Sequence, residues 1–366
     1  MLILTVNAGS SSIRLDAFFS ANNRLQRLGD VHKEQNAPFL EPLLELAENA
    51  SIDLQAVDIV AHRWVQGGPD LTRPAFLTPA LEGTLDELSS LAPLHNPAAL
   101  AWIRLVRSTL PAARHVVVPD TGYFSDLPLV AQAYALPRAL CEKFHIRRYG
   151  FHGLAHQAMW EAWVARRGNI PGDRVVTLQL GSGASAAAIR GGSPLDTSMG
   201  FTPLEGLVMA SRPGDIDPGL LMYLQRTTGM DVEAMEDLLS HHSGLIGLSD
   251  VSGDIRTLLS DSSSAALHAL NVYVYRIRKY IGSYAAVLGG LDGIVFGGGV
   301  GENSSEIRSM VVGDLDWLGV NINVQDNLAP AGNDGWIHSP DSVVKILVAQ
   351  VDEARILARA AQVMAE

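Results

Sequence analysis

The sequence has a single cysteine, Cys141, among its 366 residues. One cysteine excludes an internal disulfide, so we expect a chain that folds in a reducing cytoplasm rather than a disulfide-stapled secreted domain. Cys141 falls within residues 137–144, a stretch of helical character. We therefore expect no catalytic thiol.

Long apolar runs are also missing. No segment approaches the roughly 18 consecutive apolar residues that a membrane-spanning helix needs. The apolar start at residues 2–6 is too short for a signal peptide, and no basic region precedes it. We expect no membrane partner.

Positive charge is scarce. Lysine and arginine number 27 against 39 acidic residues, which gives a formal net charge of -12 without an acidic tail. No basic stripe is present to neutralise a phosphate backbone, which argues against a nucleic-acid partner. A protein of this charge binds an anion only by gathering arginines locally, and that is the pattern to look for.

Two common nucleotide-binding signatures are absent or out of context. No G-x-x-x-x-G-K-[ST] occurs, which excludes a P-loop. Residues 181–186 match the loose pattern G-x-G-x-x-A, but that pattern must open a helix. Too few residues follow before the turn at Gly191, and a second strand fits there better. We expect no Rossmann site.

The chain has about twice the usual domain length, so two domains are expected. Strand-like segments alternate with helical ones, which predicts an α/β protein whose sheets are covered by helices. The strands are expected at residues 2–6, 13–19, 59–61, 115–118, 175–180 and 186–189. The helices are expected at residues 79–88, 96–108, 271–288 and 351–364.

Two segments share one design, in which a strand leads through a glycine- and serine-rich turn into a returning strand. Their turns lie at residues 7–12 and 181–185, about 170 residues apart, or nearly half the chain. Such similarity suggests two related halves that each offer a hairpin loop to a common cleft. We expect the boundary between Thr121 and Arg147.

Residues 7–12, 181–185 and 297–304 read as small-residue loops that follow apolar strands. Glycine lets backbone N–H groups approach an anion, and serine adds hydroxyl donors. Each loop alone is a weak signal because many hairpins are rich in glycine and serine. Three together favour a nucleotide ligand.

A long segment without helical or strand periodicity runs from residue 196 to residue 218. Three glycines and three prolines surround a single arginine, Arg212. Loops of this length inside a compact domain are usually functional. This one is expected to hold Arg212 rigidly against a ligand, and the alternative is a structural loop with a salt-bridged arginine.

Further candidates are a cation, two histidines and two acids. Arg63 follows a strand and either reaches into a cleft or forms a surface ion pair. His152 and His156 are spaced for a metal on a helix, but nearby glycines oppose a helix there, so one histidine donating to an anion is more economical. Asp120 and Glu353 are candidates for a carboxylate beside magnesium, although an acid such as Glu353 at a helix start also complements the helix dipole.

Together these motifs resemble the acetate kinase family, from Asn7 to the last helix. The most specific segments are 148–152, 196–218 and 299–304, followed by 6–12. The resemblance implies two duplicated actin-like (ribonuclease H-like) α/β domains around a nucleotide cleft, usually in a homodimer. Residues 1–121 with the C-terminal helix 353–366 would form the first domain, and residues 122–352 the nucleotide-binding second domain.

The resemblance also implies an activity and its residues. The activity is reversible transfer of the ATP γ-phosphoryl group to acetate, with Mg²⁺ or Mn²⁺. The catalytic positions would be Arg63, Asp120, His152 and Arg212, and the metal positions Asn7 and Glu353. The substrate positions would be Arg63, Val65, Leu94, Phe151 and Pro203. The nucleotide positions would be Arg14, Gln179, Leu180, Gly181, Ser182, Gly183, Asp254, Ile255, Arg256, Gly299, Val300, Gly301, Glu302 and Asn303.

A carboxylate substrate with a pKa of about 4 is already ionised at neutral pH, so its attack on phosphorus needs no general base. Asp120 is therefore expected to position Arg63 or the metal rather than to accept a proton. Transfer would depend on positioning and on charge stabilisation by Arg63, Arg212, His152 and the metal.

The chain departs from the family pattern at several positions. Arg14 stands where lysine is usual, and Gln179 and Ser182 stand where histidine and asparagine are usual. Gln66 replaces a histidine and Pro119 a phenylalanine. These changes leave open a preference for propionate or butyrate and the use of pyrophosphate. A non-catalytic nucleotide-binding sensor is the alternative from another functional class.

Overall fold

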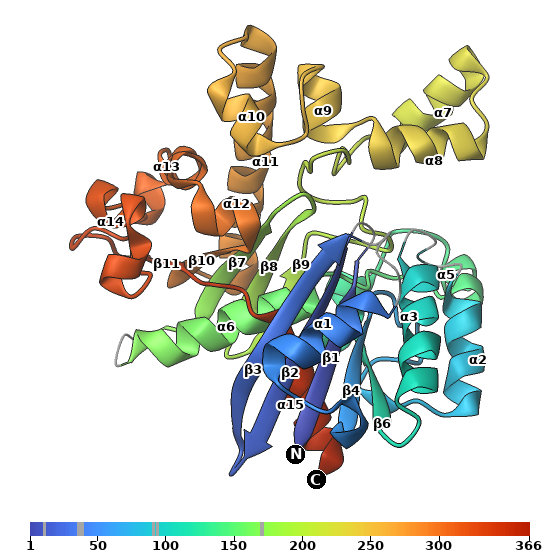
Figure 1. Ribbon diagram of the computed structural model, residues 1–366. Helices are drawn as coiled ribbons and strands as arrows, with labels where there is room; N and C mark the ends of the chain where they lie inside the picture. The colour runs from blue at the N-terminus through green and yellow to red at the C-terminus, as the bar shows by residue number, and fades with distance from the viewer. Residues whose placement is uncertain (10–11, 35–39, 90–91, 93–94, 169–171) are drawn as a thin grey trace. The chain divides into compact units, whose positions relative to one another are not determined.

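The computed structural model describes residues 1–9, 12–34, 40–89, 92, 95–168 and 172–366 (Figure 1). It contains two compact units, one formed by Met1–Ser125 with Asp352–Glu366 and the other by Asp126–Val351. The predicted pocket residue Leu94 and the loop serines Ser10 and Ser11 lie outside the described residues.

The first unit has a sheet of strand order β3-β2-β1-β4-β6-β5. Its strands are β1 (Leu2–Ala8), β2 (Ser12–Ala21), β3 (Arg24–Glu34), β4 (Ile59–Trp64), β5 (Ala75–Phe76) and β6 (Arg114–Pro119). Its helices are α1 (Glu41–Ala50), η1 (Leu54–Ala56), α2 (Pro79–Leu88), α3 (Asn96–Thr109), η3 (Asp120–Phe124) and α15 (Glu353–Ala365).

The core of this unit forms where α3 packs on β1 and β4. Alternate residues of a strand point to opposite faces, so Leu4 and Val6 share one face, where they pack with Trp64 and Trp102. Helix α15 contacts the same two strands but is not part of that core. It therefore covers the other face and brings Glu353 to the sheet.

The second unit has a sheet of strand order β11-β10-β7-β8-β9. Its strands are β7 (Arg174–Leu180), β8 (Ala184–Arg190), β9 (Ser193–Thr197), β10 (Gly293–Gly297) and β11 (Lys345–Val348). Its longer helices are α6 (Gly153–Arg167), α7 (Pro218–Thr228), α8 (Val232–His241), α11 (Ser264–Leu288) and α13 (Ser305–Val312). Its shorter helices are α4 (Leu129–Gln132), α5 (Arg138–Phe144), α9 (Gly244–Ser249), α10 (Ile255–Ser260), α12 (Gly298–Asn303), η4 (Asp316–Leu318), α14 (Val324–Leu328) and η5 (Pro330–Asn333).

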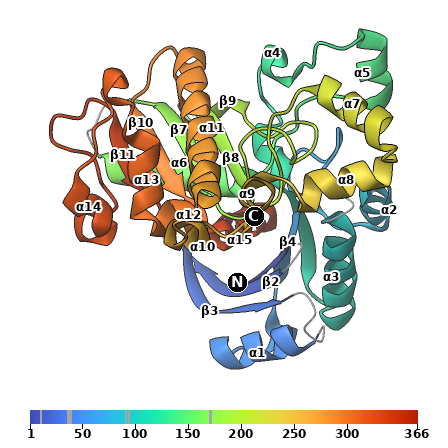
Figure 2. The same cartoon turned by 90° about the horizontal axis from the view of Figure 1, so that it is seen from above.

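Helices α6 and α11 lie on the two sides of this second sheet (Figures 1 and 2). Met159 and Trp163 of α6 pack on Val175, Val295 and Leu347, one residue from each of three neighbouring strands. Both faces are thus covered, as the sequence predicts for an α/β protein.

The two sheets repeat one topology. In each, three antiparallel strands form a meander and two further strands run parallel to the first: β3-β2-β1-β4-β6 in one unit and β9-β8-β7-β10-β11 in the other. The prediction of two related α/β halves is confirmed by this repeated order.

Several predicted boundaries differ from the structure. Residues 297–304 are not a loop, because β10 turns at Gly298 (φ 76°) directly into the short helix α12. Asn7 is still part of β1 and pairs with Arg14. The helix predicted at 271–288 begins at Ser264, where the Ser263 hydroxyl caps it by accepting from Ala266 N.

The long segment around Arg212 is irregular, as predicted, with no helix or strand from the end of β9 at Thr197 to the start of α7 at Pro218. Within the ranges that the structure describes, no helix is long and apolar enough to cross a membrane.

Candidate active site

The first unit gathers Asn7, Arg63, Asp120 and Glu353 in one hydrogen-bonded chain. The Arg63 guanidinium donates to Asn7 Oδ1 (3.1 Å) and to Asp120 Oδ2 (2.7 Å). Asn7 Nδ2 donates to Glu353 Oε2 (2.7 Å). The ends of β1, β4 and β6 meet at one sheet edge because these strands run parallel, and the start of α15 joins them there.

Charge and burial keep Arg63 cationic and constrained. Burial lowers the pKa of Arg63, but the Asp120 and Glu353 carboxylates raise it more, so the net pKa is raised. Asp120 is fully buried. Arg63 Nε is a buried donor without a hydrogen-bond partner in the described part of the chain, a rare state that calls for an explanation.

This cluster offers a divalent metal few protein ligands. The described residues contain no group of three or more histidine, cysteine, aspartate or glutamate side chains arranged to hold a metal. Mg²⁺ does not need such a cage, because it is usually bound by one or two carboxylates, by waters and by substrate phosphates. Glu353 with the amide oxygen of Asn7 is a donor set of this kind.

The second unit brings His152, Arg212 and the turn before β8 together. A Cβ atom added at Gly183 would lie 2.9 Å from Arg212 Nη2, 3.3 Å from His152 Cε1 and 3.4 Å from His152 Nε2. His152 directly precedes α6 in a left-handed backbone conformation (φ 58°), which is uncommon for residues other than glycine. The turn therefore lies against both side chains, and a larger residue at Gly183 would require the Arg212 guanidinium or the His152 ring to shift.

Arg212 has little compensation from the protein. Its Nη1 donates to the carbonyl of Pro203 (2.9 Å), and no carboxylate forms an ion pair with it among the described residues. Burial lowers the pKa of Arg212. The sequence also allowed a structural loop in which Arg212 forms a salt bridge, but the described contacts include no such salt bridge. A partly buried arginine without a carboxylate partner favours an anionic ligand.

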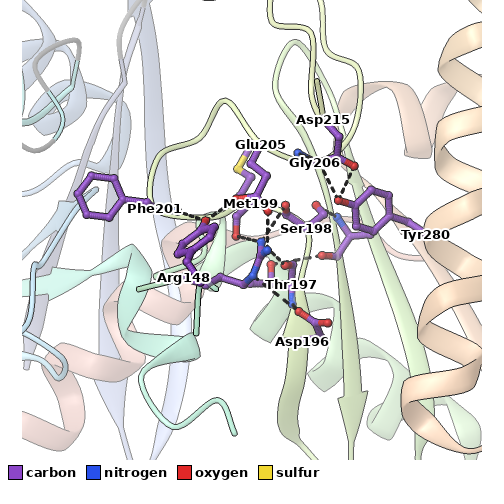
Figure 3. A network of polar contacts seen from close by, with 12 residues as sticks. Arg148, Asp196, Thr197, Ser198, Met199, Phe201, Glu205, Gly206, Asp215 and Tyr280 are labelled. Atoms are coloured by element: carbon purple, nitrogen blue, oxygen red, sulfur yellow. Dashed lines mark hydrogen bonds and ion pairs between the residues drawn. The ribbon is translucent and has the colours of Figure 1, made fainter. Parts of the chain in front are cut away.

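Arg148 fastens the start of the Arg212 segment (Figure 3). Its Nη2 donates to Glu205 Oε1 (2.5 Å), and its Nη1 faces three successive carbonyl oxygens at 3.1–3.2 Å, those of Thr197, Ser198 and Met199. Burial lowers the pKa of Arg148, but Glu205 and other neighbours raise it more. One guanidinium thus fixes the backbone that leads into the loop.

Tyr134 and Asp215 complete this network; Asp215 and its partners Gly206 and Tyr280 are drawn in Figure 3. The Tyr134 hydroxyl binds the Glu205 carboxylate and accepts from Phe201 N (2.8 Å). Farther along, Asp215 Oδ1 accepts from Gly206 N (2.8 Å), and the Tyr280 hydroxyl donates to Asp215 Oδ2 (2.9 Å). Sequence reasoning missed Tyr134, Glu205 and Tyr280 because their partners are far away in the chain.

A cavity of about 610 Å³ lies in the second unit, large enough for a small-molecule ligand. Its walls contain most of the predicted nucleotide positions, namely Gly181, Ser182, Asp254, Ile255, Arg256, Gly299, Val300 and Asn303, together with Ala210, Gly253 and Ser304. Asp254 caps α10 and pairs with Arg256 (2.5 Å), and hydrogen bonds from Arg256 lower the pKa of Asp254 to about 2. The Asp254 carboxylate and the Arg256 guanidinium in this wall are therefore both ionised at neutral pH.

Other predicted nucleotide positions do not line that cavity. Glu302 Oε1 accepts from Gly298 N (3.1 Å) and Val351 N (3.0 Å), so it holds α12 in place. Gly301 and Leu180 are buried, and a Cβ atom on Gly298 would meet the Gln179 amide. Gly183 lies instead beside His152 and Arg212.

The remaining predicted positions lie as follows. Arg14 belongs to the first unit, where its Nε is 3.3 Å from Asp16, so its charge is already partly compensated. Val65 and Phe151 are 4% and 2% exposed, and the Pro203 carbonyl holds Arg212.

The repeated sheets and their covering helices define the fold class as the actin-like, ribonuclease H-like α/β fold with two duplicated halves. The crystal structure of Porphyromonas gingivalis acetate kinase matches with a TM-score of 0.86 at 32% identity, over 100% of both chains. A propionate kinase from Francisella tularensis subsp. tularensis SCHU S4 matches with a TM-score of 0.88 at 29% identity, over 99% of both chains.

The sequence agrees with the structural likeness. The profile of the Acetokinase family matches residues 17–359. An acetate kinase of Clavibacter michiganensis subsp. michiganensis (strain NCPPB 382) is 38% identical over 386 aligned residues, which cover 98% of both chains. The chain belongs to the Acetokinase family.

Proposed function

We propose that this protein is an acetate kinase, a phosphotransferase that uses ATP and acetate to make acetyl phosphate and ADP, and that runs the reaction in both directions. The observation that carries the proposal is Arg212, a partly buried cation with no described carboxylate partner beside His152 and Gly183. Full-length similarity to acetate kinases supports the same activity.

In the proposed reaction an acetate oxygen attacks the γ-phosphorus, a new P–O bond forms, and the bond to the β-phosphate oxygen breaks. ADP leaves with the electron pair. Acetate is already ionised, so no side chain has to remove a proton. Arg63, Arg212 and His152 would stabilise charge on the transferring oxygens, and Asp120 would hold Arg63 in position.

Asn7 and Glu353 would hold the magnesium ion, which when bound neutralises phosphate charge. The nucleotide would occupy the 610 Å³ cavity of the second unit, with its phosphates directed to Gly181–Gly183. Val65, Phe151 and Pro203 would contact the acyl group. Residues 1–121 with 353–366 would act as the first domain, and residues 122–352 as the nucleotide domain.

We also propose a cytoplasmic homodimer. Leu129 and Val130 on α4 are 81% and 89% exposed, and Met222 and Tyr223 on α7 are 55% and 57% exposed. Large apolar side chains left in water favour association with a second copy.

The test is trapping of the acyl phosphate by hydroxylamine, with acetate, propionate or butyrate as acceptor and ATP or pyrophosphate as donor. We expect the largest kcat/KM with acetate and ATP. The likeness to a propionate kinase favours some activity with propionate, because one methylene changes binding by only about 1–3 kcal/mol. Absence of product with every pair would contradict the proposal and favour a nucleotide-binding sensor.

A further inference from the structure

Within the second unit, a chain of hydrogen-bonded polar groups leads from His152 to buried side chains. The Ser185 hydroxyl lies between two imidazoles, 2.9 Å from His152 Nδ1 and 2.8 Å from His156 Nε2. His156 Nδ1 is in turn 2.7 Å from Thr177 Oγ1. Ser185, His156 and Thr177 are all 0% exposed, so water does not compete for these contacts.

The number of hydrogens along this chain restricts how it can be ordered. A neutral imidazole has one N–H and one acceptor nitrogen, and a hydroxyl donates only once. Ser185 cannot donate to both rings at the same time. If both imidazoles are neutral, the three contacts are all satisfied when every hydrogen points the same way along the chain, or when Ser185 accepts from both rings and turns its own hydrogen elsewhere.

The possible orders differ at His152. In the first, Thr177 donates to His156, His156 donates through Nε2 to Ser185, and Ser185 donates to His152 Nδ1. The His152 proton then sits on Nε2, the nitrogen that lies toward Gly183 and, with it, toward Arg212. In the reverse order, and in the order in which both rings donate to Ser185, His152 Nε2 carries a lone pair, which would repel the oxygen of an anion.

We propose that Ser185, His156 and Thr177 are positioning residues that hold neutral His152 with its proton on Nε2, so that this N–H donates to the phosphoryl group held beside Arg212. The inference rests on the proposed function, because the phosphoryl group is what makes the first order the favourable one. None of the three residues touches the substrate; they act through His152.

The first test reads the tautomer directly. The full chain is labelled with ¹⁵N in its histidine rings, and long-range ¹H–¹⁵N spectra are recorded without ligand and with ADP and acetate. Signals are assigned by their loss in His152→Ala and His156→Ala. We expect protonated Nε2 and bare Nδ1 in both rings. A bare Nε2 on His152, or a doubly protonated His152, would overturn the inference.

The second test separates positioning from a structural role. Ser185→Ala should lower kcat about 10-fold and change the KM for ATP less than about threefold, because the interaction improves the transition state rather than ATP binding. Thr177→Val keeps the side-chain shape and should lower kcat about threefold. Both variants should show mixed His152 tautomers.

Ser342→Ala is the matched control, since this buried hydroxyl donates to Val344 O (2.6 Å) and has no histidine partner among the residues that the structure describes. Its kcat and its His152 signal should stay unchanged. Wild-type kcat and tautomer retained in Ser185→Ala would overturn the inference while leaving the kinase intact. A wild-type protein without kinase activity would instead refute the proposed function, and the spectra would still report the order of the chain.

Discussion

At the scale of single residues, Arg212 has the least compensated charge of the candidate site. Among the described residues its guanidinium donates to the Pro203 carbonyl and pairs with no carboxylate, and burial lowers its pKa. A guanidinium in this state gains much from an anion that carries developing charge, as in other phosphoryl-transfer sites.

Arg212→Ala should therefore lower kcat by about 10³-fold or more. Steady-state rates with acetate and ATP measure the effect, and circular dichroism checks the fold. Arg226→Ala, which removes an arginine from the last turn of α7, is the control and should change kcat less than about twofold. A loss below about tenfold in Arg212→Ala would contradict direct contact with the transferring group.

Gly183 matters because of the space that it leaves empty. A methyl group there would lie 2.9 Å from Arg212 Nη2 and 3.3 Å from the His152 ring, so one of the two must move. Gly183→Ala should lower kcat by about 10²-fold with little loss of stability, since a displacement of about 1 Å has effects of that size.

Gly282→Ala is the control for this substitution. Gly282 lies in the middle of α11, where an added Cβ would meet no atom within 4 Å. Alanine should leave kcat unchanged and stabilise the fold by about 0.5–1 kcal/mol, because it loses less backbone freedom in a helix. Wild-type kcat in Gly183→Ala would contradict the crowding between His152 and Arg212.

At the scale of elements, the segment between β9 and α7 keeps its shape without regular hydrogen bonding. Arg148 donates to Glu205 and to the carbonyl oxygens at the start of this segment (Figure 3). The Tyr134 hydroxyl binds Glu205 and accepts from Phe201 N. The loop is therefore held from the segment that follows α4 and from the segment before α6, which explains how a glycine- and proline-rich stretch can present Arg212 in one position.

Glu205→Gln tests this mechanism by removing the charge that pairs with Arg148, whose side chain is only 17% exposed. Unfolding free energy should fall by about 1–3 kcal/mol, because a buried cation loses its partner, and kcat should fall with it. Urea midpoints and kcat measure the two effects. Glu142→Gln, in a pair that is 91% and 61% exposed, should change stability by less than about 1 kcal/mol. Equal effects in both variants would contradict the account.

At the scale of the whole molecule, a histidine pair couples folding to pH. His62 Nε2 and His115 Nδ1 are 3.0 Å apart on neighbouring strands, and both rings are buried. Burial lowers the pKa of His62 and of His115, and the neighbouring His115 lowers that of His62 further. Below the ordinary histidine pKa of about 6.5, these two rings therefore bind fewer protons in the folded chain than in the unfolded chain.

Stability should consequently be complete above about pH 6.5 and fall as pH decreases from there toward the lowered native values, by up to about 1.4 kcal/mol per pH unit for each ring. Urea unfolding at pH 7.5 and 5.5 measures this. In the double variant His62→Gln/His115→Gln, the difference in unfolding free energy between the two pH values should be smaller. The control variant His32→Gln changes an exposed histidine and should keep the full difference in unfolding free energy. If the double variant also keeps the full difference, the His62–His115 pair does not cause the pH dependence.

Much of this architecture was predictable from local patterns. Short apolar runs beside glycine- and serine-rich turns indicated β1, β2, β7 and β8, and the helix at Pro79–Leu88 was predicted with the bounds that the structure has. The prediction was wrong at residues 297–304, where the glycine-rich sequence suggested a loop but the structure has the short helix α12. One long-range contact stabilises that helix, because Glu302 accepts from Val351 N as well as from Gly298 N in its own first turn.

The amino-acid sequence by itself determined the α/β class, the two related halves and the family, because these depend on short-range periodicity and on motifs that are contiguous in the chain. Only the tertiary structure decided that Arg63 is paired with a buried acid while Arg212 has no such described partner. It alone placed Ser185 between His152 and His156. The physical reason is that pairing and desolvation depend on residues brought together from distant strands and helices, and a linear pattern does not contain those distances.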